Sequence, residues 1–307
     1  METGPLVSII CGVYNHEKFI GKTLEGFLKQ ETSFPFEIIV HDDASTDNTV
    51  LVIKKYEKQF PHLFRNIYQN ENQLSQSIDS VTRITFAAAR GKYIAICEGD
   101  DYWIDPLKLQ KQVDVLEKNS KLAIAAHGSY RLTDKLSLID SPFKVDTIWS
   151  TKDILANNWF IMTASLMFRR SMIDLSPDWL PKISHGDLAL ILLASLNGDG
   201  YYTPEPMSVY RMAGLGMMSR FTVKDSKKYI FLLDQFNKKS AYKFDNEITI
   251  LKDKARIDVL QRYLTQNKNT SFFSGKYWQN LIRSLKWARI REWPYVTKRL
   301  LMDKLTK

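Results

Sequence analysis

The chain has 307 residues, 44% of them apolar and 25% charged, which is enough apolar material for a folded core without disulfide staples. Its two cysteines, Cys11 and Cys97, each lie in an apolar run, so a disulfide framework and a four-thiolate zinc site are excluded and a reducing compartment is expected. The net charge of +9 is unevenly placed, because residues 223–307 carry +12 and residues 1–222 carry −3, and this asymmetry indicates an anionic partner for the C-terminal part.

The first hundred residues alternate between strand and helix patterns. The predicted strands lie at residues 6–13, 36–41, 66–69 and 93–97. The first two are buried apolar runs, and the third is short. The predicted helices lie between them, at residues 17–30, from about residue 47, and up to about residue 90. Repeated strand–helix units of this kind predict an α/β fold with a parallel sheet and right-handed crossovers.

After residue 100 the alternation stops. Two further helices are predicted, at residues 106–118 and 187–196, with strand-like pieces at 122–127 and 164–168 and an edge strand at 209–212. From residue 223 onward the pattern is helical throughout. We therefore expect two regions, an α/β domain at residues 1–222 and a basic helical region at residues 223–307.

Aromatic and acidic side chains follow three of the predicted strands. Tyr14 and Asn15 follow the first strand, Asp42 and Asp43 the second, and Glu98–Asp101 the fourth. We expect them to meet, because ligands of open parallel sheets bind beyond the carboxyl ends of the strands. The sequence has neither a glycine-rich dinucleotide fingerprint nor a GxxxxGK[ST] loop, so a bound nucleotide would need a divalent cation, held by carboxylates, on its diphosphate. The alternative for residues 42–47 is a turn with capping side chains.

Six segments resemble, in order, the family 2 glycosyltransferases of the GT-A fold, and together they cover about two thirds of the chain. They are VSIICGVYNHEKFI, FEIIVHDDASTDNT, ARGKYIAICEGDDYWIDPLKLQKQVDVLE, TASLMFRR, HGDLALILLASLNGDGYY and MSVYR. The resemblance implies a mostly parallel twisted sheet flanked by helices, Rossmann-like, with a C-terminal helical extension. It also implies an inverting, metal-dependent transfer of a sugar from a nucleotide-sugar donor, with a UDP-sugar as the default, to a hydroxyl acceptor.

The resemblance assigns roles to individual residues. It places the nucleobase against Tyr14 and gives it a hydrogen bond to Asp42, which Asp43 shares, while Glu98 lies near the ribose. The residues implied to bind the donor are Tyr14, Asn15, Asp42, Asp43, Arg83, Glu98, Asp100 and Arg211. Of these, Arg83 and Arg211 are expected at the diphosphate.

The metal ligand and the base are also implied by the resemblance. Asp100 is the leading ligand for Mn²⁺ or Mg²⁺, with Asp101 as the alternative, and Asp187 stands where the family has its catalytic base. In an inverting transfer, such a base deprotonates the acceptor hydroxyl while the cation stabilises the departing diphosphate. The alternative for Asp187 is an ordinary N-cap of the apolar helix that follows, and for Arg211 a structural ion pair.

One position departs from the family pattern. Related sequences have a metal-ligating histidine shortly after the Tyr-Arg of the last motif, and Ala213 occupies that position here. Weaker coordination, a ligand from elsewhere (His16, His41 or His185) and lost activity all stay open. A catalytically inactive nucleotide-sugar-binding or scaffold protein is therefore the alternative function. A nucleotidyltransferase is disfavoured, because no glycine-rich loop with Lys or Arg follows the first strand.

The end of the chain is basic and rich in tryptophan. Residues 276–293 predict a helix with one apolar stripe, and residues 276–307 hold nine Lys and Arg, two acids and three Trp. This composition suits an anionic membrane surface, and hence a lipid-linked or growing surface-polysaccharide acceptor. The alternative is a helix packed on the catalytic domain, and no nucleic-acid motif is present. With neither a span of ~20 apolar residues nor a secretory signal, we expect a cytoplasmic protein, peripheral on the inner face of the membrane.

Overall fold

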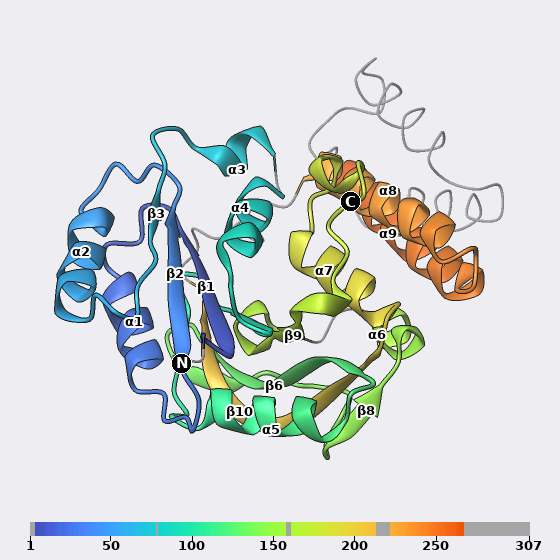
Figure 1. Cartoon of the computed structure of the whole chain (residues 1–307). Helices are drawn as coiled ribbons and strands as arrows, with labels where there is room; N and C mark the ends of the chain where they lie inside the picture. Colours follow the sequence, from blue (N-terminus) through green and yellow to red (C-terminus); the bar gives the residue numbers. More distant parts are fainter. Residues whose placement is uncertain (1–3, 78, 158–160, 213–221, 267–307) are drawn as a thin grey trace. The chain divides into compact units, whose positions relative to one another are not determined.

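The computed structural model describes residues 4–77, 79–157, 161–212 and 222–266, and the chain divides into two compact units, residues 1–219 and 220–307 (Figure 1). The first unit is built on a ten-stranded sheet. In chain order its strands are β1 (Val7–Val13), β2 (Phe36–Asp42), β3 (Ile67–Tyr68), β4 (Tyr93–Ile96), β5 (Tyr102–Trp103), β6 (Leu122–Leu132), β7 (Leu136–Leu138), β8 (Thr147–Trp149), β9 (Met167–Arg169) and β10 (Asp199–Arg211).

Helices cover both faces of this sheet. In chain order they are α1 (Ile20–Leu28), α2 (Thr49–Gln59), α3 (Gln73–Gln76), α4 (Ser80–Ala88), α5 (Lys108–Lys118), α6 (Thr151–Asn157) and α7 (Gly186–Ser195). Figure 1 shows α1 and α2 on one side of strands β1 and β2 and α4 on the other, and α5 and α7 on opposite sides of β6. The predicted α/β architecture is confirmed.

The strand order is β3-β2-β1-β4-β9-β6-β10-β5. Strands β3, β2, β1 and β4 run parallel, and the register pairs Ile9 of β1 with Ile38 of β2 and Ala95 of β4. Strand β9 is antiparallel to both β4 and β6, so β6 and its parallel neighbour β10 run in the same direction as β1. The carboxyl ends of β1, β2, β4, β6 and β10 therefore lie along one edge of the sheet.

A strand is present at residues 209–211, but the prediction that it lies at the edge of the sheet is wrong. These residues are the end of β10, a 13-residue strand inside the sheet between β6 and β5, and Met212 follows it. The prolines Pro204 and Pro206 hid the strand in the sequence, because proline interrupts sheet hydrogen bonding. The register shifts at Thr203/Pro206 and Pro206/Ser208, so irregularities in the pairing absorb both prolines.

The core of the first unit is centred on β1 and α1. Val7, Ile9 and Cys11 of β1 are fully buried, and so are Leu24 and Phe27 of α1. The helix places its buried side chains at helical spacing on one face, and each buries apolar area worth about 1.5–3 kcal/mol. Burial on both faces explains why β1 is a continuous apolar run in the sequence.

The second unit contains α8 (Val223–Lys239) and α9 (Asp245–Gln266), which contact each other, as the helical pattern after residue 223 predicts. Thr222 and Asp225 form a capping box that starts α8, and the rings of Phe236 and Phe244 stack 6.1 Å apart. The predicted helix at residues 276–293 lies outside the described residues. In the described part of the chain, no helix combines the length and apolarity that crossing a bilayer requires.

At the edge where the parallel strands begin, the sheet is held together by the buried carboxylate of Glu37. Glu37 is 2% exposed, and it accepts hydrogen bonds from Ser8 Oγ at 2.6 Å, from Arg90 N at 2.8 Å and from Arg90 Nε at 2.8 Å. Burial opposes the ionisation of Glu37, but the hydrogen bonds from Ser8 and Arg90 outweigh it and lower its pKa. This carboxylate thus joins β1, β2 and the chain entering β4.

We predict that Glu37→Gln lowers the free energy of unfolding at pH 7 by about 2 kcal/mol, because the amide cannot satisfy the Arg90 guanidinium. The stabilisation exists above the unfolded-state pKa of about 4.3 and is lost as the pH falls through the lower folded-state pKa, so the two proteins should converge in acid. Urea unfolding at pH 7 and below pH 4 measures this. Glu117→Gln, in a half-exposed pair with Lys92, is the control and should cost under about 0.5 kcal/mol.

Candidate active site

The loops that follow β1 and β2 are locked together by Asn15. Its side-chain oxygen accepts a hydrogen bond from Thr46 N at 2.7 Å, and its backbone N–H donates to Ser45 Oγ at 2.9 Å. Asn15 and Ala44 both have left-handed backbone, with φ of 57° and 64°, which costs a non-glycine residue of order 1 kcal/mol. Two of the left-handed residues of the chain therefore lie in the loops beside Tyr14, whose side chain is exposed. A direct contact of Asn15 with the donor stays a prediction.

Asp42 and Asp43 are both buried but do different work. Asp43 accepts hydrogen bonds from Gln73 N at 2.7 Å and Leu74 N at 3.0 Å, so both its oxygens hold the start of α3. Asp42 Oδ1 accepts from Ser45 N at 3.0 Å, whereas its Oδ2 is buried without a hydrogen-bond partner in the described part of the chain. An unpartnered buried carboxylate oxygen is costly, so Asp42 has the atom that a ligand would satisfy.

The acidic turn, residues 98–101, connects β4 to β5 and packs on the loop after β1. A Cβ added at Gly99 would lie 2.3 Å from Val13 Cγ1 and 2.9 Å from His16 Nδ1, so only glycine fits. From α1, Thr23 Oγ1 donates to the carbonyls of Gly99 at 3.0 Å and Asp101 at 2.5 Å. The turn is thus fixed against the core from one side.

Arg211, the last residue of β10, also binds the acidic turn, in addition to Thr23 of α1. Its backbone N–H donates to Asp101 Oδ1 at 2.8 Å, and its guanidinium donates to the Asp100 carbonyl at 2.5 Å. The guanidinium also lies 4.3 Å from the ring centre of Tyr102 and 5.3 Å from that of Phe19. Arg211 therefore holds the main chain of the turn, and its predicted contact with the diphosphate is not tested.

The two adjacent aspartates of the turn differ in availability. Asp101 is 2% exposed and commits an oxygen to Arg211 N. The Asp100 carboxylate receives no hydrogen bond from any described residue, and its side chain is more accessible. Of the two, Asp100 is the better placed to receive a ligand.

The carboxyl groups around the turn repel one another. Burial, followed by the charges of Asp101, Asp100 and Asp187, raises the pKa of Glu98 well above its usual range. Burial and the charge of Asp100 likewise raise the pKa of Asp101 to about 8. Asp187 itself is joined through Thr163 to residues 163–165, which contact β4, the strand that leads into the acidic turn. Such a cluster is stabilised by protons or by a cation.

Asp187 lies in the first turn of α7. Its Oδ1 accepts from Leu188 N at 2.9 Å and its Oδ2 from Thr163 Oγ1 at 3.2 Å. Burial raises its pKa to about 6 against the lowering effect of these two hydrogen bonds. The carboxylate is thus ionised at neutral pH and near the range that suits a general base. Thr163 was not among the predicted site residues, although it begins the matched segment TASLMFRR.

Two further predicted features have other surroundings. Arg83 pairs with Asp79 one helical turn earlier and donates to the Pro177 carbonyl at 3.2 Å, so its phosphate contact stays a prediction. Ala213, the position where a histidine is missing, lies outside the described residues. Among the residues described, no three His, Cys, Asp or Glu side chains are arranged as a ready-made metal site. His16 does reach the turn, and burial lowers its pKa while the charges of Asp100 and Asp47 oppose this.

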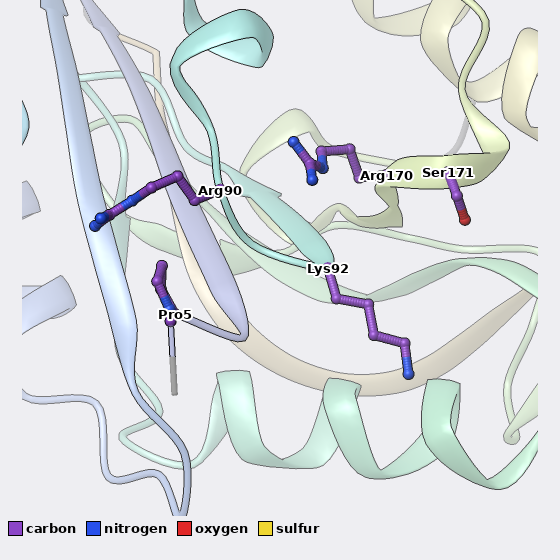
Figure 2. A pocket seen from close by; sticks show the side chains of 6 residues that line it. Pro5, Arg90, Lys92, Arg170 and Ser171 are labelled. Atoms are coloured by element: carbon purple, nitrogen blue, oxygen red, sulfur yellow. The ribbon is translucent and has the colours of Figure 1, made fainter. Parts of the chain in front are cut away.

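A cavity of about 490 Å³ lies elsewhere, where β1 and β4 begin. Its lining includes Arg90, Lys92 and Arg170 (Figure 2). Figure 2 shows these three side chains pointing in different directions rather than toward a common point. Arg90 is paired with Glu37 and Lys92 with Glu117. This cavity is therefore separate from the site at the carboxyl edge and does not gather its charges on a ligand.

Comparison with known proteins agrees with the fold. The family model described as Glycosyl transferase family 2 matches residues 8–174. An uncharacterized protein of Mycobacterium tuberculosis is 37% identical over 217 residues, which are 69% of this chain and 60% of that protein, so the chain spans about 60% of this relative.

Two solved structures share the fold at low identity. S. aureus TarS 1–349 in complex with UDP-GlcNAc has a TM-score of 0.65 at 16% identity, covering 93% of this chain and 82% of TarS. The mannosyltransferase PcManGT from Pyrobaculum calidifontis, in complex with GDP-Man and Mn²⁺, has a TM-score of 0.60 at 13% identity, covering 99% and 87%. The GT-A form of the predicted α/β fold is confirmed by these likenesses.

We predict that the stability difference between Asp187→Asn and the parent depends on pH in a defined window. Because the folded-state pKa of about 6 exceeds the unfolded value of about 3.9, the parent loses stability as the pH rises through this window, by up to about 3 kcal/mol, and the variant does not. Urea unfolding in EDTA between pH 4 and pH 8 gives the difference curve. A flat curve would contradict the burial of an ionisable Asp187.

Proposed function

Because the chain belongs to glycosyl transferase family 2, we propose that it transfers a sugar from a nucleotide-sugar donor to a hydroxyl group with inversion at the anomeric carbon. The observation that carries this proposal is the pairing of two kinds of carboxyl group at one sheet edge. The Asp100 carboxylate accepts no hydrogen bond from the described residues, and Asp187 is joined through Thr163 to residues 163–165, which contact β4, the strand before the acidic turn. Donor activation and acceptor deprotonation require these two elements.

We propose that the nucleobase binds between the loops after β1 and β2. Support comes from the Oδ2 of Asp42, which has no partner among the described residues and can accept a base N–H, and from the exposed ring of Tyr14, which follows Val13, the register partner of Asp42. TarS binds UDP-GlcNAc and PcManGT binds GDP-Man, both of which are nucleoside diphosphate sugars. A UDP-sugar is the first donor to test, and we place the ribose near Glu98.

We propose that Mn²⁺ or Mg²⁺ binds through Asp100, with Asp101 serving to anchor Arg211. The residues fit such an ion, because the Asp100 carboxylate is free of protein donors among the described residues and the neighbouring carboxyls have raised pKa values. Ions of this kind are commonly held by one or two carboxylates plus substrate phosphates, so three protein ligands are not needed. When bound, the ion supplies neutralisation of the diphosphate charge.

We propose Asp187 as the general base. Its carboxylate takes the proton of the acceptor hydroxyl as that oxygen attacks the anomeric carbon, and the nucleoside diphosphate leaves with the bonding electrons. Burial keeps this base poorly solvated, and its pKa of about 6 leaves it ionised at pH 7.5. The acceptor that we propose is a lipid-linked or growing surface-polysaccharide glycan. The alternative is an inactive nucleotide-sugar-binding or scaffold protein, favoured by Ala213.

A thermal-shift panel of nucleoside diphosphates and their sugars, each with and without Mn²⁺, tests the function. We expect one nucleotide class to raise the melting temperature only with Mn²⁺, and Asp100→Asn to lose most of that shift while Asp101→Asn destabilises the protein without any ligand. Among the variants, Asp187→Asn should keep the nucleotide-dependent shift but lose donor turnover by at least about 10²-fold.

Donor turnover separates the two functions. Binding of a nucleotide sugar with no transfer or hydrolysis by the parent would favour the inactive alternative. No Mn²⁺-dependent shift with any member of the panel would overturn the proposed donor site.

We propose that the protein acts in the cytoplasm and contacts the inner face of the membrane through its basic C-terminal region, which carries +12 over residues 223–307. Replacing Arg283, Lys286 and Arg289 by Glu should remove most binding to liposomes containing phosphatidylglycerol, measured by co-sedimentation at low salt. Three exposed lysines of the first unit, changed to Glu together, are the control: Lys55, Lys58 and Lys121. Equal loss in both triple variants would leave only nonspecific charge attraction.

A further inference from the structure

The carboxylate of Asp187 is held by a side chain from another segment. Thr163 Oγ1 donates to Asp187 Oδ2 at 3.2 Å, and Thr163 is the first residue of the one-turn 3-10 helix η1 (Thr163–Ser165). The other carboxylate oxygen, Asp187 Oδ1, accepts a hydrogen bond from Leu188 N within α7. The orientation of the carboxylate is therefore set by where η1 lies.

The η1 turn is fixed in turn by two buried side chains. Trp103 Nε1 donates to the Ala164 carbonyl at 2.8 Å, and Gln112 Nε2 donates to the Ser165 carbonyl at 2.8 Å and the Ala125 carbonyl at 2.9 Å. Trp103 is 3% exposed and Gln112 is 4% exposed, so neither bond competes with water.

A fully buried lysine orders these two side chains. Lys108 Nζ lies 4.0 Å from the ring centre of Trp103 and donates to Gln112 Oε1 at 2.7 Å. With its oxygen engaged by Lys108, the Gln112 amide turns its NH₂ toward the Ser165 carbonyl. Burial lowers the pKa of Lys108 to about 7. Because burying an amine is unfavourable, its contacts with Trp103 and Gln112 compensate for the lost hydration.

Trp103 stands two residues after Asp101, in β5, so the same side chain belongs to the segment that leaves the acidic turn. We infer that Thr163 is a positioning residue for the base Asp187, and that the buried cluster of Trp103, Lys108 and Gln112 fixes Thr163 relative to the acidic turn. This inference rests on the proposed role of Asp187. Its consequence is that the base and the donor-side carboxylates move as one body.

The need for such a link follows from in-line displacement. The acceptor oxygen, the anomeric carbon and the leaving oxygen must align, and a displacement of 1 Å in the supporting groups can cost about 10²-fold in rate. The base comes from α7 and the acidic turn from the end of β4, so a packed connection must set their separation. The cluster supplies it without contacting either carboxylate directly.

The first test needs neither donor nor metal. The free energy of unfolding of the parent, Thr163→Val, Thr163→Ser and Asp187→Asn is measured with urea in EDTA from pH 4 to pH 8. The value for Asp187→Asn is subtracted from that of each other protein, and the pH midpoints of the difference curves are compared. Glu98, whose pKa is raised by burial and by the charges of Asp101, Asp100 and Asp187, is present in every variant. Thr163→Val should raise this midpoint by about one pH unit, since it removes a hydrogen bond to the charged form, and Thr163→Ser should restore it.

The cluster is tested by the same midpoint. Trp103→Phe removes the hydrogen bond to Ala164 and should raise the midpoint in the same direction as Thr163→Val, and the two shifts should not add in the double variant. Trp149→Phe is the matched control, because Trp149 is also fully buried but its Nε1 has no hydrogen-bond partner among the described residues. An unchanged midpoint in Thr163→Val, or equal shifts from both tryptophan variants, would overturn the inference.

Turnover then separates this inference from the proposed function. With the donor found in the nucleotide panel, Thr163→Val should lower kcat about tenfold with the donor KM within twofold, and the acid limb of kcat should move with the midpoint. If the midpoint depends on Thr163 but the protein shows no turnover, the positioning of Asp187 by Thr163 is supported and the proposed transferase activity is overturned. If the protein turns over the donor but Thr163→Val does not shift the acid limb of kcat, the transferase activity is supported and the positioning role of Thr163 is overturned.

Discussion

Repulsion among clustered carboxyl groups is the constraint around which this site is built. Burial and the charges of Asp101, Asp100 and Asp187 raise the pKa of Glu98. Four such groups stay together only if the chain that carries them is held from outside. Thr23, Gly99 and Arg211 do so through main-chain contacts and close packing.

The support of the site is divided between its loops and the sheet beneath. The left-handed residues Asn15 and Ala44 lie in the loops of the site, while the sheet is fixed by continuous apolar strands and by the Glu37 ion pair at the opposite edge. That opposite edge carries its own cations, but each of Arg90 and Lys92 is paired with a glutamate. The charges at the edge where β1 and β4 begin are therefore neutralised within the protein, whereas the carboxylates at the carboxyl edge can be neutralised by a bound cation.

Adjacent residues of the same type divide their roles in this structure. Asp43 caps α3 while Asp42 keeps an open oxygen, and Asp101 holds Arg211 while Asp100 stays free of protein donors in the described part of the chain. The side chain of Arg211 donates to a main-chain carbonyl of the turn, so its observed contact is a structural hydrogen bond and not the ion pair predicted as its alternative. Arg83 is similarly engaged, by Asp79.

The sequence alone determined the α/β alternation, the buried strands and the edge at which Asp42, the acidic turn and Tyr14 meet, because buried parallel strands need unbroken apolar runs and their carboxyl ends share one side. Only the tertiary structure decided which of two neighbouring aspartates keeps a free oxygen, that β10 lies inside the sheet despite its prolines, and that Thr163 reaches Asp187. Those outcomes depend on hydrogen bonds between residues such as Asp101 and Arg211, 110 positions apart, and on pairing irregularities, none of which leaves a local pattern in the chain.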